Sequence, residues 1–186
     1  MEKEILIPEK LDELTLEQWQ KIKAVTDKEG VSDEFIVQTI LRVVYSIKGD
    51  ILVRIGVKHI DMLLASYREV IEQRPVFQNQ FILNGKKYGF IPNLDNITAG
   101  ELADLDMYAK DVATHHKLMS ILFRKVTKAL GNDYKIESYK GSNDELKRMP
   151  LGIALGAVAF FLDLGKDLTR SMLESLEEEN PQLLTR

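Results

Sequence analysis

The N-terminal part of the chain places apolar residues at helical spacing. They recur every three or four positions along three segments, as expected for helices that bury one face. Capping and terminating residues bound these segments, so helices are predicted over residues 15–29, 32–49 and 57–73. Residues 1–13, which precede the first cap, are predicted to form an extended arm.

The same helical pattern returns in the second half of the chain. Thr98 and Glu101 have the spacing of a capping box and begin a fourth predicted helix. A fifth is predicted over residues 115–130, with Gly131 as its terminator. The last helix is predicted over residues 151–178, and its first half is apolar nearly all round, which indicates a central position. Residues 179–186 are predicted to be a loose acidic tail.

Between these two parts, the spacing of apolar residues changes from the helical period to the alternation with a period of two that is typical of strands. Apolar runs flank Asn84-Gly85, and this dipeptide favours a type I′ turn because both central residues need a positive φ. A β-hairpin is therefore predicted at about residues 80–91, within a projecting region of residues 76–96. Residues 134–139 also alternate and predict a short third strand that pairs with this hairpin.

These elements predict a mainly α (α+β) fold, a single-domain helical bundle of about six helices with one hairpin. The length of 186 residues suits one domain, residues 1–186, and no internal repeat divides it. Hydrophobic residues make up 45% of the chain and charged residues 29%, which is typical of a globular domain.

Charge and cysteine content exclude several classes of function. The net charge of −4 argues against general nucleic-acid binding, which needs a basic face. The chain has no cysteine, so a disulfide framework, a thiolate zinc site and a cysteine nucleophile are excluded. The charged N-terminus lacks the apolar core of a signal peptide, and the apolar run Leu151–Leu162 is shorter than the roughly 18 residues that span a bilayer.

Two polar clusters have the spacing of a chemical site. One is a set of carboxylates on the fourth predicted helix, namely Glu101, Asp104, Asp106 and Asp111. Such a set could bind Mg²⁺ or act in acid–base chemistry, but it is more typical of a solvated helix face. The other is the pair of Asp111 and His115, which are four residues apart on a helix. A metal site here would need a third ligand from elsewhere, so a polar helix junction is the simpler interpretation. We therefore predict that the chain has no catalytic, cofactor-binding or metal-binding residues and that it is not an enzyme.

Three further features suggest contact with other molecules. Lys117, Arg124 and Lys128 recur at helical spacing. They predict either a solvated helix face or a surface that binds an acidic partner or a phosphate backbone. Gly152 and Gly156 have the spacing that lets helices approach closely, either inside the fold or at a subunit interface.

The hairpin is the third such feature and has the most binding character. Phe81, Tyr88 and Phe90 carry more aromatic surface than an isolated two-stranded ribbon buries, and Asn84 and Gly85 form its turn. Either the hairpin packs on its own helices or it docks on another subunit. Its five residues, with Gly152 and Gly156, are the candidate protein-interaction residues.

Several segments resemble a loosely defined family of small proteins from the structural and assembly modules of tailed bacteriophages, notably those infecting Bacteroidetes. The resemblance spans about residues 78–165 and rests on the runs Phe81–Pro92, Ile97–Leu105, His116–Arg124 and Ala159–Leu162. Where the family suggests a Tyr-Arg-Pro-like ending, this chain has Phe123-Arg124-Lys125. The family provides no active-site residues to transfer.

The resemblance implies a non-enzymatic structural protein of the virion, in a ring or connector or in the tail near the portal. The protein would be located in the virion, and in the host cytoplasm during assembly. Its expected partners are other phage structural proteins and further copies of itself, with no membrane and with nucleic acid only through proximity to packaged DNA. The alternatives are a tail assembly chaperone absent from the mature particle, a small enzyme, and a DNA-binding regulator.

Overall fold

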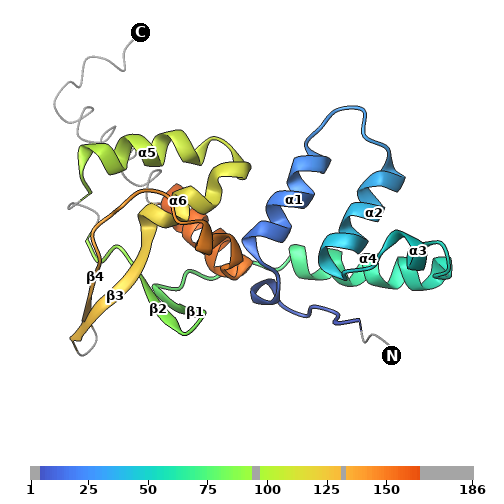
Figure 1. Cartoon of the computed structure of the whole chain (residues 1–186), viewed down its shortest axis with the longest axis horizontal. Helices are drawn as coiled ribbons and strands as arrows, with labels where there is room; N and C mark the ends of the chain where they lie inside the picture. Colours follow the sequence, from blue (N-terminus) through green and yellow to red (C-terminus); the bar gives the residue numbers. More distant parts are fainter. Residues whose placement is uncertain (1–4, 94–96, 131–132, 164–186) are drawn as a thin grey trace, which may run out of the picture.

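The computed structural model describes residues 5–93, 97–130 and 133–163, and these form an α+β fold (Figure 1). The labelled helices are α1 (Leu16–Thr26), α2 (Asp33–Val44), α3 (Gly49–Leu52), α4 (Val57–Ile71), α5 (Ala99–Ala109) and α6 (His115–Leu122). A further helix covers residues 151–163. Short 3₁₀ turns are η1 (Leu11–Glu13), η3 (Val112–Thr114) and η4 (Asp144–Arg148). The strands are β1 (Gln80–Leu83), β2 (Lys86–Phe90), β3 (Phe123–Leu130) and β4 (Asp133–Ile136).

The first three predicted helices are confirmed, with shorter ends. Thr15 and Gln18 form the predicted capping box at α1, and the Ser32 hydroxyl accepts the N–H of Phe35 at the start of α2. Helix α2 stops at Val44 rather than near residue 49. Ser46 adopts a φ of 55°, and the next residue turns back to donate its N–H to the Leu41 carbonyl of that helix.

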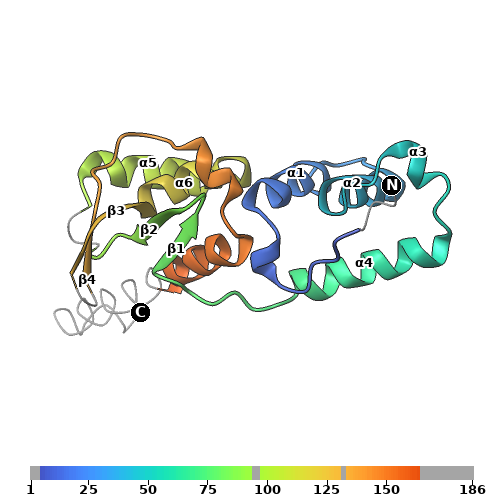
Figure 2. The same ribbon diagram turned by 60° about the horizontal axis from the view of Figure 1, so that its bottom comes forward.

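Helices α1 to α4 gather at one end of the molecule, and the sheet with α5 and α6 forms the other end (Figures 1 and 2). Helix α2 packs against both α1 and α4. The Tyr45 hydroxyl donates a buried hydrogen bond of 2.6 Å to the Leu63 carbonyl, which fixes the end of α2 on α4.

The sheet has four antiparallel strands in the order β1-β2-β3-β4. The predicted hairpin is confirmed as β1 and β2, with Asn84 at φ 50° and Gly85 at φ 72° in its turn. The predicted third strand is confirmed in part, as β4, but it pairs with β3 rather than with the hairpin. The prediction of a hairpin plus one strand therefore missed one strand.

The missed strand is β3, where the predicted helix over residues 115–130 was wrong in its second half. Helix α6 ends at Leu122, and residues 123–130 continue directly as a strand. Residues 123–125 pair with β2, and residues 126–130 pair with β4. These two pairings satisfy the backbone polar groups along the strand and outweigh the local helical pattern.

Residues from both ends of the described chain join the two parts of the molecule. Leu16 donates its N–H to the Met149 carbonyl at 3.0 Å, and Leu151 donates to the Leu14 carbonyl at 2.8 Å. Leu11, Leu14, Met149 and Leu151 are all buried in one continuous core. The first half of the predicted last helix is thus central, as expected, whereas residues 164–186 lie outside the described ranges.

Within residues 5–93, 97–130 and 133–163, no helix is both long and apolar enough to cross a bilayer.

Candidate functional site

The structure places the three aromatic candidates of the hairpin in the core. Phe81, Tyr88 and Phe90 are 7%, 1% and 4% exposed. They lie on one face of the sheet with Phe123, and the rings of Phe90 and Phe160 lie 5.7 Å apart in an edge-on contact. Of the two alternatives for the hairpin, the structure shows packing within its own fold, because the helix of residues 151–163 covers the aromatic face.

The hairpin turn contacts η4 of the same chain. Glu145 accepts hydrogen bonds from the Asn84 amide at 3.2 Å and from the Tyr88 hydroxyl at 3.0 Å, and it pairs with Lys86 at 3.4 Å. Burial and the Glu145 carboxylate raise the pKa of Tyr88 to about 12. Asn84 and Gly85 remain exposed at the turn, so they are the accessible members of the hairpin set.

The two candidate glycines make close contacts inside the chain. A Cβ on Gly152 would meet Leu11 at 3.2 Å and crowd the Asp12 carboxylate, and a Cβ on Gly156 would lie 2.6 Å from the Val76 carbonyl oxygen. Of the two alternatives left by the sequence, these contacts show tight packing of the fold on the helix of residues 151–163.

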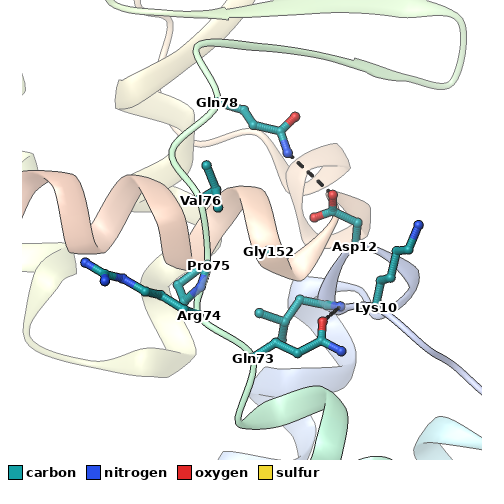
Figure 3. A pocket seen from close by; sticks show the side chains of 9 residues that line it. Lys10, Asp12, Gln73, Arg74, Pro75, Val76, Gln78 and Gly152 are labelled. Atoms are coloured by element: carbon teal, nitrogen blue, oxygen red, sulfur yellow. Dashed lines mark hydrogen bonds between the residues drawn. The ribbon is translucent and has the colours of Figure 1, made fainter.

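A small pocket of about 190 Å³ lies beside Gly152, where the arm meets the end of α4 (Figure 3). The Gln73 amide donates to the Glu9 carbonyl at 2.7 Å and accepts the Leu11 N–H at 3.3 Å, so it holds the arm at two points. Gln78 donates to Asp12 at 3.4 Å, whereas Arg74 points away from that carboxylate (Figure 3). These contacts suit a structural joint rather than a site that holds a substrate.

The carboxylates of α5 do not converge on a common point. Glu101 caps its helix through Thr98 and forms a buried ion pair with Arg124 at 2.8 Å. Asp104 accepts a hydrogen bond from the Tyr139 hydroxyl at 2.9 Å, and Asp106 pairs with Lys110 at the surface. Although burial acts to raise it, the pKa of Glu101 is held below its usual value by hydrogen bonds from Thr98 and by Arg124.

The pair predicted from spacing, His115 and Asp111, stays close enough for the Asp111 charge to act on His115, although burial still lowers the pKa of this histidine. Asp111 accepts the Ala113 N–H and caps η3. His116 is 5% exposed, and its Nδ1 lies 3.1 Å from the Gln20 amide. Burial, with Lys147 nearby, lowers its pKa. Among the residues that the structure describes, no group of three or more His, Asp or Glu side chains could hold a metal ion.

The predicted basic helix face does not form. Helix α6 ends before Arg124, whose guanidinium is turned inward toward Glu101 and the carbonyls of Ile121 and Glu137. Lys128 lies on β3, and Lys117 lies over the Tyr108 ring at 5.4 Å. The three cations therefore belong to different surfaces.

A surface that the sequence reasoning missed lies at the far end of the helical part. An apolar groove of about 360 Å³ runs between the arm and the α3–α4 region. Its lining residues are Ile5, Ile7, Arg54, Ile55, Gly56, His59, Met62 and Leu63. A signal was present in the sequence, because Ile5-Leu6-Ile7 is a short apolar run in a charged arm and Val53 and Val57 flank the loop before α4.

Several apolar side chains of this region are exposed. Met62 in the lining is 52% exposed, and Leu6, Val53 and Val57, which adjoin lining residues in the chain, are 79%, 86% and 73% exposed. A groove with exposed apolar side chains is typical of a protein-interaction site. We call the groove, together with Leu6, Val53 and Val57, the arm–α4 surface, and it is the candidate functional site.

Comparisons with models of known protein families, with curated proteins and with solved structures found no match.

Proposed function

We propose that the chain is a non-enzymatic structural protein of a tailed-phage virion, a ring, connector or tail component near the portal. The phage assignment rests on the resemblance over about residues 78–165. The observation that carries the interaction role is the arm–α4 surface, where Leu6, Val53 and Val57 are each more than 70% exposed. Covering them on a partner would remove apolar area from water, which is the main driving force of association.

The contacts of the polar side chains agree with a role in binding. Glu101 and Asp111, two of the residues with the spacing of a chemical site in the sequence, serve as a helix cap with an ion pair and as a turn cap. Each is held by neighbours of the same fold. The backbone bridge between Thr15 and Pro150 supports the expectation that residues 1–186 act as one domain.

Mass spectrometry of purified phage particles tests this proposal. The chain is expected in mature particles, in a fixed ratio to the portal protein and at a higher level than in a mock purification from uninfected host cells. Presence in assembly intermediates with a tape-measure-like protein, together with absence from mature particles, would overturn the virion role and favour a tail assembly chaperone. Absence from both would overturn every assembly role.

A further inference from the structure

The arm–α4 surface has the form of a site for an amphipathic helix. Its groove is lined by aliphatic side chains from two directions, with Ile5 and Ile7 on the arm and Met62 and Leu63 on α4. The arm is held along α4, because the Ser66 hydroxyl donates to the Pro8 carbonyl at 3.4 Å. A groove with apolar walls accepts a helix whose anchors recur every three or four residues.

The sequence after residue 163 carries such a series of anchors. Leu164, Leu168, Met172 and Leu176 follow one another at intervals of four, the spacing of one helical face. The segment then becomes acidic, with Glu174 and the run of residues 177–179. A segment with this pattern can bury its apolar face in a groove of matching character.

The charges of the two surfaces are complementary. The ionisable side chains in the lining of the groove, Arg54 and His59, are basic. Opposite charge at the rim of an interface favours one partner and one orientation over others. An acidic segment with an apolar face therefore suits this groove.

We propose that residues 164–186 of one copy dock in the arm–α4 groove of a second copy. The partner is another molecule because the helix of residues 151–163 starts beside α1 and runs away from the helical end (Figure 2). Its later residues, Phe160 and Phe161, pack on Phe90 of the sheet. The chain therefore leaves the described region at the end of the molecule opposite to the groove.

Docking of this kind is head-to-tail, because the two surfaces in contact are different. Repetition of a heterologous contact closes a ring or extends an open filament. This head-to-tail docking deepens the proposed function. It rests on the proposed function only for the expectation that the chain associates with itself. It specifies the contact that would build a ring or tail layer.

Sedimentation velocity of the full-length chain at increasing concentration tests the contact. The wild-type chain is expected to associate. Met62→Glu in the groove and Leu176→Glu in the segment are each expected to weaken association by about tenfold or more, because each buries a charge at an apolar contact. The matched control is Met107→Glu on α5, since Met62 and Met107 are 52% and 54% exposed. It is expected to associate as the wild type does.

Mixing the two defective variants distinguishes head-to-tail docking from other arrangements. Met62→Glu retains an intact segment and Leu176→Glu an intact groove, so the mixture is expected to form one-to-one dimers that grow no further. A wild-type chain that is monomeric at every concentration would overturn the inference. So would Leu176→Glu associating as the wild type does, which would indicate pairing of two grooves. Either result concerns this contact alone, whereas the virion role is decided by the particle composition.

Discussion

Gly89 lies under the ring of Tyr134, which crosses from β4 over β2. The Tyr134 hydroxyl lies 2.7 Å from the Phe90 carbonyl and 3.1 Å from the Asn79 carbonyl, and its single proton is donated between these two acceptors, so the ring is held in place. A Cβ on Gly89 would approach Cδ2 of this ring to 2.8 Å. The glycine is therefore required by a neighbour from another strand rather than by its own backbone angles.

Replacing this glycine is expected to destabilise the protein through overpacking. Gly89→Ala should lower the free energy of unfolding by about 1–3 kcal/mol, measured by urea denaturation. The control is Gly100→Ala in the first turn of α5, where an added Cβ meets nothing within 4 Å. That change should be neutral or stabilise by about 0.4–1 kcal/mol. Equal urea midpoints for Gly89→Ala and the wild type would show that Tyr134 is not fixed over Gly89.

His116 makes stability depend on pH near neutrality. Burial lowers its pKa in the folded chain, and burial lowers the pKa of His115 as well. An unfolded histidine titrates near pH 6.5, so below that pH the unfolded chain binds protons that the folded chain does not. Stability is therefore expected to fall as the pH is lowered from 7 to 5.

Urea denaturation across this pH range checks the histidine prediction. His116→Gln should reduce the slope of unfolding free energy against pH, and His115 should account for part of the slope that remains. Carboxylates whose pKa is lowered in the fold, such as Glu17 and Glu145, add their own loss of stability at lower pH. A slope unchanged by His116→Gln would show that this histidine titrates alike in both states.

At the scale of elements, the ion pair between Glu101 and Arg124 fastens α5 to β3. Both side chains are largely buried, at 7% and 12% exposure, and their atoms lie 2.8 Å apart. The Arg124 guanidinium also donates to the Ile121 and Glu137 carbonyls. Removing one partner of such a pair leaves a buried charge without compensation.

Glu101→Ala is expected to cost about 3 kcal/mol of stability, because it leaves Arg124 unpaired and removes the helix cap. Asp106→Ala is the matched control on the same helix. Its carboxylate is 73% exposed and pairs with Lys110 at the surface, so stability should hardly change. Urea denaturation of both variants measures the difference. A small effect of Glu101→Ala would indicate that water reaches Arg124.

The elements also show how far local sequence signals reach. The capping boxes at Thr15 and Thr98 were predicted correctly, because a cap is made within four residues of one segment. Residues 123–130 were predicted as helix, because Val126 continues the apolar spacing of α6. The partners of residues 123–125 lie in β2, more than 30 positions earlier, where no local pattern reveals them. Residues 126–130 pair with β4 only a few positions later, so this local hairpin was missed because the helical spacing was followed instead.

At the scale of the whole molecule, the segment between α4 and β1, which connects the helical end to the sheet end, packs on the helix of residues 151–163. Gly156 lets the Val76 backbone approach, and Phe77 stacks on Phe160 with ring centroids 4.4 Å apart. Gly156→Ala should lower the free energy of unfolding by about 1–3 kcal/mol, because a backbone carbonyl cannot move aside as a side chain can.

Sedimentation separates this effect from a subunit contact. If Gly156 acts inside the fold, Gly156→Ala should associate as the wild type does while unfolding at lower urea concentration. Gly100→Ala again provides the reference for a glycine with open space around it. Weakened association with unchanged stability would instead place Gly156 at an interface between copies.

The sequence by itself determined the helix starts, the Asn84-Gly85 turn and the mainly helical character with a hairpin, because each depends on residues close together in the chain. The tertiary structure decided that residues 123–130 form a strand, that the hairpin aromatics are buried, and that Glu101 is paired with Arg124. It also decided which apolar residues stay exposed at the arm–α4 surface. Burial, the ion pair and the pairing of β3 with β2 depend on distant segments, and no local spacing encodes them.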